Sequence, residues 1–148
     1  MKNTEESFYI KLRVKIQDWI KTDKGKNLKY VNYILVVPDL FYVLWQLLID
    51  DRVSTEFKLK VGLVIAYFVS PIDLIPEAIF GPVGYLDDIG LTAGLLSIMM
   101  EDYREIVEEI WAKVNHNNIL ELVQEIIKNI DNIIGHGIWN RLRTKFGI

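Results

Sequence analysis

The chain has 148 residues, enough for one hydrophobic core, and it contains no cysteine. Disulfides and thiolate metal sites are therefore excluded, and a reducing compartment is favoured. The formal net charge is −3 with a sequence pI of about 5.4, and no basic stripe lies outside the two ends of the chain, so nucleic-acid binding is disfavoured.

The first predicted element is a basic amphipathic helix that ends near residues 23–25. Apolar residues recur at helical spacing over residues 8–20, although apolar and polar residues also alternate in its first half as in a strand. We favour a helix, because the chain has no second strand candidate that would pair with it. Lys11, Arg13 and Lys15 make the segment basic.

The N-terminal residues lack the uninterrupted apolar run of a secretory leader. We therefore expect a cytoplasmic protein, either in solution or associated with the cytoplasmic face of a membrane.

The longest apolar stretch covers residues 28–49, and Pro38 divides it. Proline removes a hydrogen bond inside a helix but fits its first position, so we expect a short helix ending near Val36 and a second one from Pro38 to Ile49. Asp39 then lies in a first turn, where the positive helix end favours a carboxylate. Because an Asp near the middle of a span costs about 2.5–3.5 kcal/mol on insertion scales, we favour a kinked pair, soluble or half-inserted, over a transmembrane helix.

A turn at residues 50–54 precedes a helix from Thr55 to Val69, for which Ser54 is the predicted N-cap. Residues 61–69 are apolar on nearly all sides, which is typical of a helix buried in protein or in lipid. This half of the helix rises only about 13 Å, whereas a bilayer core is about 30 Å thick. Alone it is too short to cross a membrane.

The link that follows is rich in proline and acid. Pro71 and Pro76 predict that the incoming helix ends near Ser70. Asp73 is placed to accept hydrogen bonds from the backbone N–H groups that such a break frees.

A returning helix is predicted after a tight turn at residues 81–84, with Asp87 or Asp88 as its cap. It runs to about Val114, and its first half is apolar on all sides. Residues 115–118 break it.

The last predicted long helix is capped by Asn118 and ends at the glycines of residues 135–137. Residues 138–148 follow as a tail, to which no element is assigned.

Together these elements predict an all-α fold: a compact multi-helix domain around an apolar helical hairpin with a Pro/Asp-rich connecting loop. We expect a single domain over residues 1–148. The hairpin occupies residues 52–100, and flanking helices occupy residues 1–51 and 101–148.

The charges are unevenly distributed over these elements. Residues 1–30 hold eight Lys or Arg against four Asp or Glu, whereas residues 31–100 hold three against eight. No Lys or Arg lies between Lys60 and Arg104. Two interpretations stay open: an apolar, acidic middle with basic ends that meets an anionic membrane surface, or a buried hairpin surrounded by solvated helices.

The link between the two hairpin helices resembles a known family. It runs Tyr67-Phe68-Val69-Ser70-Pro71-Ile72-Asp73-Leu74-Ile75-Pro76-Glu77 and then Gly84-Tyr85-Leu86-Asp87-Asp88. This run is similar to the YkvA-like family, a domain of unknown function, in which Tyr-x-x-Ser-Pro-Ile-Asp-Leu-Ile-Pro-Asp leads to Gly-Tyr-Leu-Asp-Asp. Glu77 stands where the family usually has Asp, and the link of residues 78–83 is one residue longer than usual.

The resemblance implies a helical hairpin that is often predicted to touch membrane, and it brings no established activity, substrate or cofactor. We take its characteristic residues as the candidate structural loop: Tyr67, Ser70, Pro71, Asp73, Pro76, Glu77, Gly84, Tyr85, Asp87 and Asp88.

Four carboxylates of this loop, Asp73, Glu77, Asp87 and Asp88, lie within 16 residues of one another. Capping or structural pairing is the favoured interpretation. The alternative is a site for a hard cation such as Mg²⁺ or Ca²⁺, which takes oxygen ligands, or for proton transfer. We expect no cofactor and no metal.

No phosphate-binding loop, dinucleotide fingerprint or serine nucleophile elbow occurs in the sequence, and we expect no catalytic residue. The favoured hypothesis is a non-enzymatic membrane-associated or scaffold module, which meets a membrane surface or a membrane protein through the hairpin and the basic ends. One alternative is a soluble homo-oligomer that hides the same hairpin, and another is a carboxylate-based metal or proton-transfer site.

Overall fold

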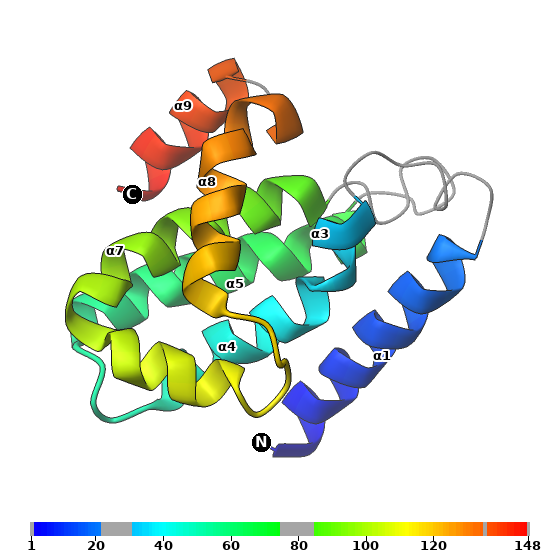
Figure 1. Cartoon of the computed structure of the whole chain (residues 1–148). Helices are drawn as coiled ribbons and strands as arrows, with labels where there is room; N and C mark the ends of the chain where they lie inside the picture. The colour runs from blue at the N-terminus through cyan, green and yellow to red at the C-terminus, as the bar shows by residue number, and fades with distance from the viewer. Residues whose placement is uncertain (1, 22–30, 75–84, 135, 148) are drawn as a thin grey trace.

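The computed structural model describes residues 2–21, 31–74, 85–134 and 136–147 (Figure 1). All regular elements in these ranges are helices, which confirms the predicted all-α class. They are α1 (Lys2–Ile20), α3 (Val31–Leu35), α4 (Val37–Ile49), α5 (Thr55–Leu74), α7 (Tyr85–Trp111), α8 (Ile119–Ile134) and α9 (His136–Phe146).

Helix α7 is the centre of the fold. It packs against α3, α4, α5, α8 and α9, while α1 packs on α4 and α3 (Figure 1). Every residue from Ile89 to Leu96 is buried. A helix that is apolar on all sides needs cover on all sides, and here the neighbouring helices of the same chain supply it.

The start of α5 is capped and anchored to α7. The Phe57 N–H donates to Ser54 Oγ at 3.3 Å, which confirms the predicted cap. The Ser54 N–H donates to the Tyr103 hydroxyl at 3.0 Å, and the rings of Phe57 and Tyr103 meet edge to face at 5.6 Å. Because Tyr103 has non-helical dihedrals (φ −124°, ψ 23°), the kink in α7 lies at the point where the helix holds α5.

Several predicted boundaries are confirmed. The first segment is a helix and not a strand, and α3 and α4 meet within one residue of the predicted break at Pro38. Asn118 caps α8, since the Glu121 N–H donates to Asn118 Oδ1 at 3.1 Å.

The predicted end of α5 near Ser70 is wrong, because the helix continues through Pro71 to Leu74. A proline inside a helix removes one hydrogen bond and favours a kink, but it does not forbid a helix that tertiary packing supports. The long helical run before Pro71 packs against α4 and α7. Asp73 therefore lies inside α5 and not behind a break.

The returning helix also begins earlier than predicted. Since α7 starts at Tyr85, Asp87 and Asp88 are its third and fourth residues and do not occupy the N-cap position. Carboxylates in a first turn still benefit from the positive end of a helix.

Helix α8 ends at Ile134, as the glycines of residues 135–137 predicted, but a further helix follows it. Residues 136–146 form α9, where the sequence predicted only a tail. Trp139 is buried, and α9 packs against α8 and α7. Burial of one large aromatic side chain stabilises a short helix whose own propensity is weak.

Candidate functional site

The predicted loop is described only in part. The backbones of Tyr67, Ser70, Pro71 and Asp73 lie in α5, and those of Tyr85, Asp87 and Asp88 lie in α7. Pro76, Glu77 and Gly84 lie outside the described residues, as do the side chains of Asp73, Asp87 and Asp88. The carboxylate site thus stays a prediction, and no group of three His, Asp or Glu that would hold a metal occurs among the described side chains.

A polar cluster around Asp39 joins three separate parts of the fold. The Tyr9 hydroxyl of α1 donates to Asp39 Oδ1 at 2.9 Å, and Asn115 Nδ2 donates to Asp39 Oδ2 at 3.0 Å. Asn115 belongs to the loop between α7 and α8, where its Oδ1 accepts the Asn117 N–H at 2.8 Å. One carboxylate in the first turn of α4 therefore holds both α1 and this loop.

The cluster further disfavours ionisation of the Tyr9 hydroxyl. Burial raises the pKa of the Tyr9 hydroxyl, and the hydrogen bond to the negatively charged Asp39 raises it further, while Arg13 acts in the opposite direction. Tyr9 therefore serves as a hydrogen-bond donor to Asp39 at neutral pH.

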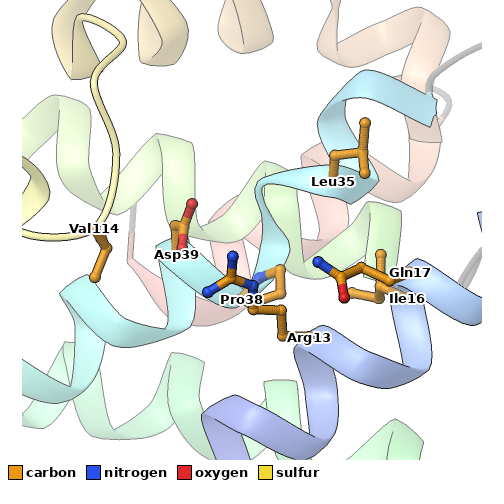
Figure 2. Close-up of a pocket in the computed structure, with 7 residues that line it drawn as sticks. All are labelled: Arg13, Ile16, Gln17, Leu35, Pro38, Asp39 and Val114. Atoms are coloured by element: carbon orange, nitrogen blue, oxygen red, sulfur yellow. The ribbon is translucent and has the colours of Figure 1, made fainter.

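A pocket of about 140 Å³ lies beside the cluster, between α1 and α4 (Figure 2). In Figure 2 the Arg13 guanidinium and the Gln17 amide both extend from α1 toward α4, on whose first turn Asp39 lies. The pocket is lined by Arg13, Ile16, Gln17, Leu35, Pro38, Asp39 and Val114.

The lining of this pocket combines both signs of charge with an amide and an apolar wall. Arg13 supplies a cation, Asp39 an anion and Gln17 an amide, and the other lining side chains are apolar. Asp39 is the carboxyl group of this lining, and its two oxygens accept hydrogen bonds from Tyr9 and Asn115.

A second, more open hollow of about 390 Å³ lies around the loop between α7 and α8. The Trp111 indole N–H donates to the Asn117 carbonyl at 2.8 Å and fixes this loop. His116 lines the hollow and is exposed.

Two helices carry exposed apolar pairs at a spacing of four residues, so that each pair shares one helix face. On α1, Ile10 and Val14 are 51% and 50% exposed, and on α5, Leu59 and Leu63 are 67% and 54% exposed. None of the helices in the described ranges has the length and apolar character that a bilayer crossing demands.

The charges next to the two pairs differ. Lys11 and Arg13 are exposed beside the pair on α1. On α5, Lys60 is half-buried, and its Nζ donates to the Gly147 carbonyl at 3.0 Å and lies over the Phe57 ring. The cations of α1 are therefore the more accessible.

Sequence reasoning found Asp39 only as a first-turn carboxylate and missed its partners. Tyr9 and Asn115 lie 30 and 76 residues from Asp39. Helical spacing relates residues three or four apart, so it does not predict contacts between residues this distant in the sequence. The one sequence signal for this part of the molecule was the basic helical pattern around Arg13.

Residues 58–94 match the family model described as "Protein of unknown function (DUF1232)". The matched segment covers most of α5 and the first part of α7, and it contains the characteristic run of residues 67–88. The resemblance to the YkvA-like family is thereby confirmed.

Curated relatives of this chain include an uncharacterised protein and ubiquitin ligases. "Uncharacterized protein ORF9" of Methanothermobacter thermautotrophicus is 24% identical over 108 residues, which are 72% of this chain and 73% of that protein. "E3 ubiquitin-protein ligase RNF170" of Xenopus laevis is 40% identical over 57 residues, 36% of this chain and 22% of the ligase. The protein of that name from Xenopus tropicalis is 49% identical over 43 residues, 29% of this chain and 17% of the ligase.

The similarity to the ligases thus spans about a fifth of their length. No solved structure matches the chain. What the comparisons identify is a DUF1232 segment at residues 58–94, built from α5 and the start of α7.

Proposed function

We propose that this chain is a non-enzymatic helical module that docks on an anionic membrane surface through the outer face of α1. The observation that carries the proposal is the half-exposure of Ile10 and Val14 on the basic second part of α1, where Lys11, Arg13 and Lys15 lie. Between residues 9 and 21 the sequence holds four cations, Lys11, Arg13, Lys15 and Lys21, against the single acid Asp18.

The packing of α1 defines which face is free. Leu12 and Ile16 are 2% and 1% exposed, so the side of α1 that carries them is the side packed on α4 and α3. Ile10 and Val14 lie on the opposite side, because residues two apart on a helix point about 200° apart.

Such a face has the properties of an interfacial helix. An amphipathic helix with exposed apolar residues flanked by Lys and Arg lies in the headgroup plane and buries its apolar residues among the acyl chains. Each Lys or Arg near an anionic leaflet contributes about 1 kcal/mol of attraction, which favours lipid as the occupant of this face.

The hairpin is a poorer docking element than α1. The apolar first half of α7 is enclosed by helices of the same chain, and Lys60 of α5 is already bonded to the Gly147 carbonyl. A surface role for α1 also agrees with the basic N-terminal part of the sequence, which holds eight Lys or Arg among residues 1–30.

Co-sedimentation with vesicles tests the proposal. We expect the protein to bind vesicles of phosphatidylserine and phosphatidylcholine and to remain free of vesicles of phosphatidylcholine alone. The double variant Ile10→Asp/Val14→Asp is expected to lose binding, because it places two charges in the apolar interface.

The matched control is Leu59→Asp/Leu63→Asp, which makes the same change in charge on the exposed pair of α5. It is expected to retain most of the binding. Equal loss in both variants, or no binding by the unaltered protein, contradicts docking through α1. A stable dimer in the absence of vesicles that only the α1 variant dissociates would assign this face to a second copy of the chain.

A further inference from the structure

We infer that the pocket between α1 and α4 binds an α-amino-carboxylate group, presented by a free amino acid or by the headgroup of phosphatidylserine. The lipid source rests on the proposed function, whereas the amino acid source does not. The inference is based on Arg13 and Asp39, which belong to different helices and line the same small pocket.

The hydrogen bonds described for Asp39 come from neutral donors, the Tyr9 hydroxyl and the Asn115 amide. A carboxylate has about four lone-pair sites, so two donors leave room for others. No ion pair joins Asp39 to Arg13 among those described. Both of these donors to Asp39 are neutral. An ammonium group in the pocket would place a positive charge next to the Asp39 carboxylate and form a charge-assisted hydrogen bond with it.

Arg13 offers the complementary half of the site. Its guanidinium presents a planar set of N–H donors that matches a carboxylate with two parallel hydrogen bonds. Figure 2 shows this group directed from α1 toward α4, with the Gln17 amide beside it. The side chain of Arg13 is exposed on α1, so a ligand reaches it from solvent.

The two opposite charges restrict the class of ligand. Inorganic phosphate or a simple anion would be repelled by Asp39, and a simple cation would be repelled by Arg13. A group that carries an ammonium and a carboxylate on one carbon atom satisfies both side chains at once.

The size of the pocket sets a second limit. Its volume of about 140 Å³ is below the range of about 300–1,000 Å³ that buries drug-sized ligands, so only a small group enters it. Ile16, Leu35, Pro38 and Val114 form the apolar part of the wall. The remainder of a phospholipid would stay outside, next to the exposed apolar pair of α1.

Titration of the isotope-labelled protein with soluble headgroup analogues tests the pocket itself. Glycerophosphoserine and L-serine are expected to shift the NMR signals of the Asn115 side-chain amide and of Arg13 Nε. Glycerophosphoethanolamine has no carboxylate and is expected to bind at least about tenfold more weakly, since it forgoes a charge-assisted pair with Arg13.

The variant Arg13→Gln is expected to abolish the response to both serine probes. Lys11→Gln removes the same charge from the same helix at a residue that does not line the pocket, and it is expected to leave the response unchanged. Equal effects of the two substitutions would overturn the site and leave only general electrostatic attraction.

Vesicles that contain either phosphatidylserine or phosphatidylglycerol, at equal charge, separate the two sources. We expect preference for phosphatidylserine, lost in Arg13→Gln and kept in Lys11→Gln. Binding to L-serine without any binding to vesicles supports the pocket for a free amino acid and refutes the membrane proposal. Equal binding to both lipids, with no response to either serine probe, refutes the pocket and leaves the membrane proposal intact.

Discussion

Single polar residues connect parts of the chain that the hydrophobic core alone does not fix. Arg52 is an example in the turn between α4 and α5. Its Nε and Nη2 donate to the two oxygens of Asp50 at 3.0 and 2.8 Å, and Nη2 also reaches Glu109 of α7 at 3.1 Å. The Arg52 N–H donates to Asp50 Oδ1 as well, so one carboxylate orders the turn.

This geometry makes a prediction for the titration of Asp50. The side-chain hydrogen bonds from Arg52, more than any other cause, lower the pKa of Asp50 from 3.8 to about 2. Because the folded-state pKa is the lower one, the stabilisation is fully present above pH 3.8 and is lost as the pH falls through about 2. NMR titration of the Asp50 carboxyl carbon measures this directly.

Two substitutions test whether the hydrogen bonds from Arg52 are the cause of the low pKa of Asp50. Arg52→Gln is expected to return the pKa of Asp50 toward its ordinary value, whereas Glu109→Gln, which leaves the Asp50–Arg52 bonds in place, is expected to change it little. A pKa of Asp50 near 3.8 in the unaltered protein would show that the paired geometry is not populated in solution.

At the scale of helices, local chemistry predicted the starts at which a side chain caps the helix. Ser54 and Asn118 were identified as caps because a side-chain oxygen at that position satisfies a free N–H of the first turn, and both hydrogen bonds are present. The break at Pro38 was identified from another local property, since proline removes a hydrogen bond inside a helix but fits its first turn. Such signals depend on residues close together in the sequence and not on tertiary contacts.

The predicted features that failed depend on tertiary packing. The helix passes through Pro71 because α4 and α7 support the segment before it, and α9 forms because Trp139 is buried. The site around Asp39 could not be predicted from the sequence for a similar reason. Its contacts to Tyr9 and Asn115 form when α1 and the loop between α7 and α8 pack against α4. Local sequence patterns do not predict that packing.

The cap of α8 gives a prediction at this scale. Asn118→Ala removes the acceptor of the Glu121 N–H and is expected to lower the free energy of unfolding by about 1 kcal/mol. Asn117→Ala is the control one residue earlier, because the contacts described for Asn117 involve its backbone N–H and carbonyl and are kept in alanine. Urea denaturation of both variants checks the difference. Equal losses would mean that the cap adds nothing to the stability of α8.

The whole molecule is organised so that its most apolar segment is covered by its own helices. Five helices surround α7, and the fully buried residues of α7 include Leu91, Leu95 and Leu96. The exposed large apolar side chains among the described residues lie at the periphery, in pairs on α1 and α5 and singly at Leu35 and Ile49. This division supports a module that keeps a stable core and offers only its outer helices for docking.

The central position of α7 is tested by truncating one of its side chains. Leu95 is fully buried, so Leu95→Ala is expected to lower the free energy of unfolding by about 2–5 kcal/mol through lost burial and the cavity left behind. Leu59 is 67% exposed, and Leu59→Ala is expected to change the stability by no more than about 0.5 kcal/mol. Chemical denaturation without detergent compares the two variants. If Leu95→Ala proved as mild as Leu59→Ala, α7 would not be enclosed as described, and its apolar half would become the leading candidate for membrane contact in place of α1.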